Sequence, residues 1–515
     1  MKNVKKLLVL LLTLTIALSL FAGCNGGGSS SSSAASQASS TDAGSEDSAA
    51  PAGLDTSKEV ELVMYVISDR PAKQDEIDAN YNAILKEKLN ATIKLNWIGW
   101  AEYANKYPLL FSSGEKFDMA YTATWLNYAQ LAQRGAFKDI TELWPTYAPL
   151  NYARQSETAK QQATINGKYY CVPTLLATYS AYGPIYRTDI MEGTDWDGKM
   201  ENLADLETYL SIVKESTTME PYNVYQQGSE VDDVFMFEHG LYAIKGSTND
   251  FLWFDPQEAN PTLFTYYEYE NTPEFLEMMN RWNENGYFPK SALSDTDSTK
   301  VRNGKAATRM HNVDAYQGEA IDNPDWGFKY ANFVTDVSNM SFTQDALAIA
   351  NTSENPERAL AFYDFLTSDE TFYRAFTYGI EGVSYEIIDG QVKQPSNPDE
   401  YAFSALWAAR TPGLHLATVG TPADIATMKA DWDSHIVDGQ GSQKFRSLTI
   451  DTNSVETEYA ACLNVHQQYW WPLELGYTDP VAGLEEYKAK MEAAGIDKVR
   501  EALQKQLDDY LASLG

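Results

Sequence analysis

The sequence predicts an α/β fold built on parallel sheets, and three observations lead to this class. An almost continuous apolar run at residues 62–67 (LVMYVI) is typical of a strand that is covered on both faces. Helical and strand patterns then alternate up to about residue 131. Strands that alternate with helices in this way pair in parallel through right-handed crossovers. The chain beyond residue 58 is also long enough for two or three domains with substantial cores.

The elements that carry this alternation follow from the spacing of apolar residues. Ile77, Tyr81, Leu85 and Leu89 recur at helical intervals, and the residues after them alternate as a strand does. Pro108 interrupts the next helical pattern, so we expect that helix to be kinked or to start late. The elements expected after the first strand are a helix over 77–89, a strand over 93–97, a helix over 101–114, a strand over 117–121 and a helical segment over 126–131.

Turn and capping residues mark the elements further along the chain. Asn166-Gly167 is a strong tight-turn signal, and an extended segment follows it at 168–173. Asn202 should cap a helix that runs to about residue 215. Other helices should start where Thr or Asn precedes a Pro in the first turn. They are expected over 272–286, over 355–366 and from 421 onward, followed by two C-terminal helices divided at Gly495.

The N-terminal stretch predicts a bacterial lipoprotein signal peptide over residues 1–23. Three lysines precede an apolar run that is too short to be interpreted first as a membrane-spanning helix. The run ends in Ala22-Gly23-Cys24, so Cys24 would become the mature N-terminus and carry the lipid. Phe21 stands where such signals usually have Leu, and the alternative is an ordinary signal peptide with an incidental cysteine.

Residues 24–57 are rich in Gly and Ser, and we expect them to form a disordered tether. The segment contains no aromatic residue and one Leu. Such a composition cannot bury enough apolar surface to offset the loss of chain entropy on folding. A flexible coil of ~33 residues spans roughly 30 Å, which suits a folded body held clear of a membrane.

Charge and cysteine content exclude several classes of function. The formal net charge of −33 argues against nucleic acids and anionic membrane surfaces as partners, because both are polyanions. Beyond Cys24 only Cys171 and Cys462 remain, and they could form one disulfide or stay as buried thiols. The 33 Tyr and 12 Trp residues suit a protein that stacks aromatic rings on polar ligands.

Six short motifs occur in an order that resembles family 1 extracellular solute-binding proteins of ABC importers, in a lipid-anchored, oligosaccharide-type subgroup similar to maltodextrin-binding proteins. The resemblance covers nearly all of residues 60–515. The motifs lie at 113–119 (SGEKFDM), 166–173 (NGKYYCVP), 303–307 (NGKAA), 355–362 (NPERALAF), 378–385 (YGIEGVSY) and in the tail at 479–510.

This resemblance implies a two-lobed periplasmic-binding-protein-like fold, in which each lobe is a mainly parallel sheet flanked by helices and crossover strands join the lobes. Lobe 1 would comprise 58–175 and 332–378, and lobe 2 would comprise 176–331 and 379–515. A carbohydrate would bind between the lobes and pass to the permease subunits of an ABC importer. The resemblance implies no catalytic residue and no cofactor. It implies a monomer on the extracytoplasmic face of the membrane, in a subgroup common in Gram-positive bacteria.

Candidate ligand contacts follow the strands of the first lobe, because open parallel sheets bind ligands at the carboxyl ends of their strands. Asp69 and Arg70 follow the first strand, Trp100 follows the second and Trp125 follows the third. Aromatic rings stack on the C–H faces of a pyranose, while carboxylates and guanidiniums pair with its hydroxyls. The alternative is that the charges are solvated loop residues and that one Trp covers the sheet edge.

The second lobe offers further candidates with weaker signals. Tyr179 and Tyr182 lie in the first crossover, and His311 follows the strand at 307–310. By resemblance to maltodextrin-binding proteins, Tyr316 is the nearest match to an aromatic residue that stacks on sugar. The remaining candidates are Glu381, beside the glycines of the second return to lobe 2, and Trp407. For each of them, core packing or a hinge role is an equal alternative.

An enzyme is the main alternative class of function. The sequence contains no zinc-protease, nucleophile-elbow or phosphate-loop motif. The loop at 193–198 faintly resembles a calcium loop, but it lacks the first Asp and the final Glu. A surface-anchored glycan-cleaving enzyme stays open, because two carboxylates placed by the fold suffice for that chemistry. A sensor or adhesin that kept the fold without transport is a third interpretation.

Overall fold

The computed structural model describes residues 51–100, 102–176, 178–225, 230–246, 250–394, 398–401 and 407–514. The predicted signal peptide, Cys24 and the tether up to residue 50 lie outside the described residues. The last predicted tether residues, however, belong to the folded body. Leu54 packs against the first hydrophobic core, and Arg358 donates to the carbonyl of Asp55. The body therefore begins before residue 58, where the sequence analysis placed its start.

The first sheet has five strands in the order β2-β1-β3-β13-β6. β1 pairs in parallel with β2 and β3, which confirms the alternation predicted for this part of the chain. β13 runs antiparallel to both of its neighbours, so the sheet as a whole is mixed. The strands are β1 (Val60–Ile67), β2 (Ala91–Ile98), β3 (Met119–Thr122), β13 (Ala346–Ile349) and β6 (Val172–Pro173).

Helices cover this sheet through the apolar spacing that predicted them. Tyr81 and Leu85 of one helix are fully buried and share a core with Leu62 and Phe362. The second helix starts at Tyr103, close to the expected start at residue 101, and holds Pro108 in its interior. The helices of this body include α1 (Gln74–Leu89), α2 (Tyr103–Ser112), α3 (Tyr128–Gln133), α4 (Leu143–Tyr147), α5 (Pro149–Arg154), α6 (Glu157–Gln162), α11 (Pro356–Ser368) and α12 (Glu370–Thr377).

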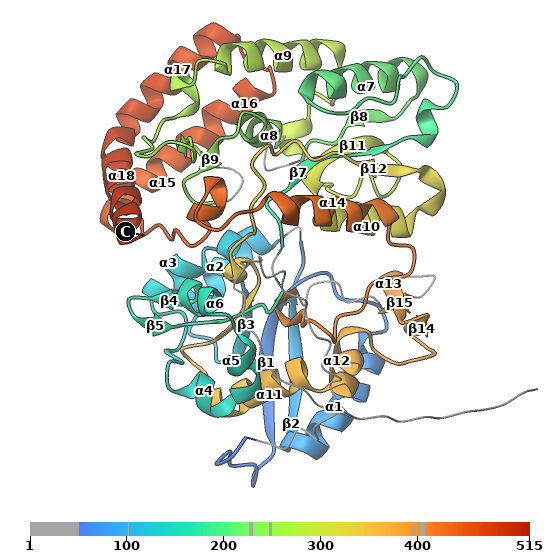
Figure 1. Cartoon of the computed structure of the whole chain (residues 1–515), viewed down its shortest axis with the longest axis vertical. Coiled ribbons are helices and arrows are strands. Elements are labelled where there is room, and N and C mark those ends of the chain that lie inside the picture. The colour runs from blue at the N-terminus through green and yellow to red at the C-terminus, as the bar shows by residue number, and fades with distance from the viewer. Residues whose placement is uncertain are drawn as a thin grey trace, which may run out of the picture. The chain divides into compact units, whose positions relative to one another are not determined.

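A second sheet of four strands has the order β12-β7-β11-β8 and is grouped apart from the first (Figure 1). β7 runs antiparallel to β12 and β11, and only β11 and β8 pair in parallel. The expectation of a mainly parallel sheet is therefore wrong for this body, because its chain returns through β7 in the opposite sense. The strands are β12 (Phe328–Tyr330), β7 (Tyr182–Arg187), β11 (Ala306–Asn312) and β8 (Glu220–Tyr222).

Three of the predicted capping residues around the second sheet begin or end helices as expected. The side chain of Asn202 accepts from the N–H of Asp205 at 2.9 Å, and Gly286 and Gly495 end helices with left-handed backbone. Ile496, Val499, Leu503 and Leu507 are buried from one face of the last helix. These helices are α7 (Leu203–Ser216), α8 (Val231–Glu238), α9 (Thr272–Asn285), α10 (Val313–Asp322), α14 (Ala423–His435), α15 (Glu456–Val465), α16 (Trp471–Glu474), α17 (Pro480–Ala494) and α18 (Ile496–Ser513).

The third crossing between the bodies falls later than the sequence boundary at residue 379. Ile380, Tyr401 and Leu414 pack against the first core, and the hairpin of β14 (Glu386–Ile388) and β15 (Gln391–Lys393) extends from this segment. Packing on the second body resumes at Ile425 in α14. The described residues from 380 to about 414 therefore belong with the first body, since Ile380, Tyr401 and Leu414 pack against its core.

Smaller elements complete the described residues. They are the hairpin of β4 (Thr164–Ile165) and β5 (Lys168–Tyr169), the pair β9 (Tyr242–Ala243) and β10 (Trp253–Phe254), and α13 (Pro398–Tyr401). Cys171 and Cys462 are buried free thiols in separate cores, which decides the question that the sequence left open. Among the helices of the described residues, none has the length and hydropathy needed to cross a membrane.

Candidate functional site

Three half-buried tryptophans gather at the carboxyl ends of β1, β2 and β3, and we call Trp100, Trp125 and Trp407 the tryptophan cluster. The ring centroids of Trp100 and Trp125 are 6.2 Å apart with an interplanar angle of 27°, and Trp407 lies 5.7 Å from Trp100. Trp100 follows β2 and Trp125 follows β3, the two strands that flank β1, so the parallel strands bring both residues to the same edge of the sheet as predicted. Trp407 reaches the same place from a distant part of the chain.

Two tyrosines that the sequence analysis missed complete this aromatic surface. Tyr103, in the first turn of α2, packs edge-on against Trp125 at 5.6 Å. Tyr121, in β3, is fully buried beneath Trp125 and Trp407 at 6.0 and 6.1 Å. The position of Tyr103 just after Trp100 was a usable signal, because both residues follow the end of the same strand.

Arg410 links the two bodies three residues after Trp407. Its Nη1 donates to Asp314 in α10 at 3.0 Å, and its Nη2 donates to Asp345, just before β13, at 2.9 Å. Tyr121 donates its hydroxyl to the other oxygen of Asp345 at 2.5 Å. Burial raises the pKa of Asp345 even though Arg410 opposes this. The pKa of Asp314 is lowered, because Arg410 together with a lysine outweighs burial.

The second body contributes a polar group centred on Glu230. Tyr182 donates to this carboxyl group at 2.8 Å, and Tyr225 donates to its other oxygen at 3.5 Å. Burial raises the pKa of Glu230 to about 7, although Tyr182 and Arg309 act to lower it. The Tyr182 ring also stacks on His311 at 5.8 Å and 26°. Tyr182 and His311 are thus brought together, whereas Tyr225 and Glu230 had no sequence signal.

His311 is held in its neutral form. Burial, reinforced by the nearby Arg309, lowers the pKa of His311 to about 3. Its Nδ1 accepts the backbone N–H of Asn312 at 2.9 Å. A neutral imidazole stacked on Tyr182 provides a flat surface with hydrogen-bonding capacity and no charge.

The aromatic surface and the polar group lie within electrostatic range of each other. The pKa of Tyr225 is raised by burial and by Glu230, and Tyr103 of the first body adds to this effect. Arg410 connects the same two bodies beside Trp407. Together, the two groups present stacking surfaces from one body and hydrogen-bonding groups from the other.

Asp69 and Arg70, the predicted residues at the end of β1, differ in whether their side chains are already paired. Asp69 is exposed, and its Oδ1 lies so close to Gly99 that a Cβ there would be 2.7 Å away. It therefore lies beside the residue that precedes Trp100. Arg70 instead pairs with Asp75 of α1 at 2.6 Å, so its guanidinium turns toward the helix.

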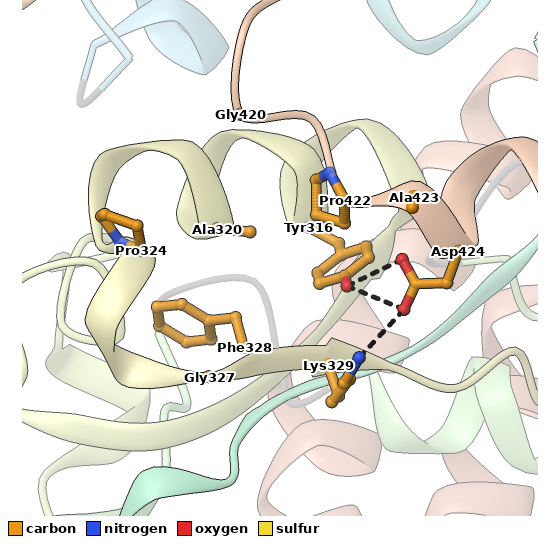
Figure 2. Close-up of a pocket in the computed structure, with 10 residues that line it drawn as sticks. All are labelled: Tyr316, Ala320, Pro324, Gly327, Phe328, Lys329, Gly420, Pro422, Ala423 and Asp424. Atoms are coloured by element: carbon orange, nitrogen blue, oxygen red, sulfur yellow. Dashed lines mark hydrogen bonds and ion pairs between the residues drawn. The ribbon is translucent and has the colours of Figure 1, made fainter.

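Three other predicted residues lie outside the aromatic surface and the polar group. Tyr316 is fully buried, and its hydroxyl lies 3.1 Å from both oxygens of Asp424, which Lys329 also approaches (Figure 2). The prediction that its ring stacks on sugar is therefore wrong for this structure. Tyr179 packs on α14 and donates to Asp433 at 2.8 Å. Glu381 is exposed in the turn that follows α12, on the first body.

Solved structures with the same architecture show which fold this chain has. The N-glycan transport solute binding protein NgtS of Streptococcus pneumoniae, in complex with Man1GlcNAc, has a TM-score of 0.73 and 22% identity, over 88% of this chain and 100% of that chain. The alginate-binding protein AlgQ2 has a TM-score of 0.62 and 16% identity, over 88% and 98%. At this identity they show the fold, which is that of two-lobed solute-binding proteins.

The protein belongs to the bacterial extracellular solute-binding proteins, since residues 79–388 match that family. Residues 445–512 match a domain of unknown function, DUF3502, which covers α17 and α18. A carbohydrate ABC transporter substrate-binding protein of Streptococcus pneumoniae serotype 4 is 25% identical over 470 residues, which cover 87% of this chain and 91% of the relative. The family resemblance is thereby confirmed, and with it the interpretation as a binding protein and not an enzyme.

Proposed function

We propose that the protein captures an oligosaccharide between its two lobes and delivers it to an ABC importer. The observation that carries this proposal is the tryptophan cluster, in which three half-buried indoles from distant segments lie together at the strand ends. Soluble proteins rarely leave such a surface partly open unless it binds something. The C–H faces of a pyranose match it, and the relatives named above are described as carbohydrate- or glycan-binding.

Each lobe has a distinct role in this proposal. Lobe 1, from the start of the body to about residue 175 together with about 340 to about 419, supplies Trp100, Tyr103, Trp125 and Trp407 for stacking, because Phe333 and Val337 pack in lobe 2. Lobe 2, comprising the rest, supplies Tyr182, Tyr225 and His311 for the sugar hydroxyls. Asp69 stands at the rim as a further acceptor. Hinge closure would bring the two sets onto opposite faces of one ligand.

We also propose that Cys24 carries a lipid, palmitate among its acyl chains, after removal of the signal peptide. The Gly/Ser-rich tether would then hold a monomeric receptor near its permease on the extracytoplasmic face of a Gram-positive cell membrane. Two observations support this arrangement: the apolar run ends in two small residues followed by Cys24, and residues 25–50 are rich in Gly and Ser.

Thermal unfolding of the purified mature chain with a panel of mono-, oligosaccharides and peptides tests the sugar proposal. We expect a concentration-dependent rise in Tm with one class of oligosaccharide, because a ligand that binds only the folded state stabilises it by mass action. Stabilisation by peptides and by none of the sugars would contradict the proposal.

A further inference from the structure

The arginines near the candidate site already have carboxylate partners in the described part of the chain. Arg309 of β11 donates to Glu319 of α10 at 2.8 Å and also to the carbonyl of Ser298. Its side chain is 13% exposed and that of Glu319 is 4% exposed, so the pair is largely removed from water. Arg309 is nevertheless close enough to influence the pKa of Glu230 and of His311.

The other cations near the site are also paired with carboxylates. Arg410 is shared between two carboxylates, and Lys429 lies 3.6 Å from the Asp314 carboxylate. Arg70 pairs with Asp75. The segments 226–229 (QQGS) and 402–406 (AFSAL), which lie next to Tyr225 and Trp407 in the sequence, contain no lysine or arginine.

Acidic groups, in contrast, are in excess around the same surface. Asp69 is exposed beside Gly99, Asp345 lies under Tyr121, and Glu230 lies between Tyr182 and Tyr225. A bound anion would need a guanidinium or ammonium group that is free to pair with it. Here it would meet guanidiniums that are already paired with carboxylates, together with further acidic groups, in partly desolvated surroundings, which is unfavourable.

We infer that the site selects uncharged oligosaccharides and rejects those that carry a carboxylate, sulfate or phosphate. This inference rests on the proposed function and narrows it to one class of glycan. Within the same fold an alginate-binding protein exists, so the fold itself does not decide the charge of the ligand. The pairing of the arginines in this chain decides it.

Calorimetry with the mature chain measures its affinity for pairs of glycans. The two members of each pair differ in that one carries acidic groups and the other does not. The pairs are oligogalacturonates with their carboxyl-reduced forms, oligomannuronates with oligomannoses, and sialyllactose with lactose. For any pair that binds, we expect the acidic member to bind at least about tenfold more weakly, which is ~1.4 kcal/mol. An acidic member that binds as tightly as its neutral counterpart would overturn the inference and leave the proposed function standing. Binding of no carbohydrate would overturn both.

A pair of glutamate variants tests the cause. Glu319→Gln removes the charge that neutralises Arg309, and should raise the affinity for the acidic member relative to the neutral one several-fold. Glu207→Gln is the matched control, because Glu207 pairs with Arg281 on the exposed surface of α7 and should leave the ratio unchanged. An unchanged ratio in Glu319→Gln would refute the role of charge pairing. If that variant does not fold, the comparison on the native chain still decides the inference.

Discussion

Glu230 provides a test of the polar group that does not require the ligand. Glu230 is only 8% exposed, and burial raises the pKa of its carboxyl group from 4.5 to about 7. A carboxyl group whose pKa is higher in the folded state binds its proton more tightly there. Its contribution to stability is therefore fully present below pH 4.5 and is lost as the pH rises through 7. The difference between these pKa values corresponds to about 3 kcal/mol.

Glu230→Gln removes this titration while it keeps the shape of the side chain. We expect the free energy of unfolding of the variant, relative to the native chain, to increase by about 3 kcal/mol between pH 4.5 and pH 8. Urea unfolding followed by tryptophan fluorescence measures this difference at each pH. Glu354→Gln is the control, since Lys116 lowers the pKa of the exposed Glu354 and gives the opposite sign. A difference for Glu230→Gln that stays flat or falls with pH would refute the reasoning.

Three further predictions concern the aromatic surface, the link between the lobes and the anchor. Trp125→Ala should weaken oligosaccharide binding about tenfold or more in calorimetry, because buried aromatic anchors contribute ~2 kcal/mol to binding. The control is Trp326→Ala, which should leave the affinity unchanged, since the half-buried Trp326 stacks on an arginine elsewhere in the second lobe. Arg410→Met should cost about 3–5 kcal/mol in urea unfolding by leaving Asp345 unpaired, and adding Asp345→Asn should recover part of it. Cys24→Ser should release soluble protein that binds ligand as before, and full membrane retention in cell fractionation would contradict the anchor.

Elements whose start or end is marked by a capping or turn residue within a few positions were predictable from the sequence. The cap at Asn202, the helix ends at Gly286 and Gly495 and the hairpin at Asn166-Gly167 all occur as expected. The parallel pairing of β1 with β2 and β3 was predictable because each strand precedes a helix. The antiparallel course of β7 was not predictable, because its neighbours in the sheet, β11 and β12, are more than a hundred residues away in the sequence.

The candidate site divides in the same way. Trp100 and Trp125 follow the two strands that flank β1 in parallel, so the sheet geometry was enough to bring them to the same edge. Tyr316 also follows a strand, yet its ring turns away to Asp424, a residue 108 positions further on that the sequence could not pair with it. Glu230 has no local signal at all, because its importance comes from burial and from tyrosines on other elements.

We expect the segment that carries Trp407 and Arg410 to couple ligand binding to the arrangement of the lobes. Trp407 contacts Trp100 on lobe 1, and three residues later Arg410 bonds to Asp314 on lobe 2. A change in the relative position of the lobes must therefore alter either the stacking surface or this ion pair. A sugar that occupies both faces would favour the arrangement in which both contacts exist. Binding and lobe closure thus share one short segment, and weakening either contact should weaken the other.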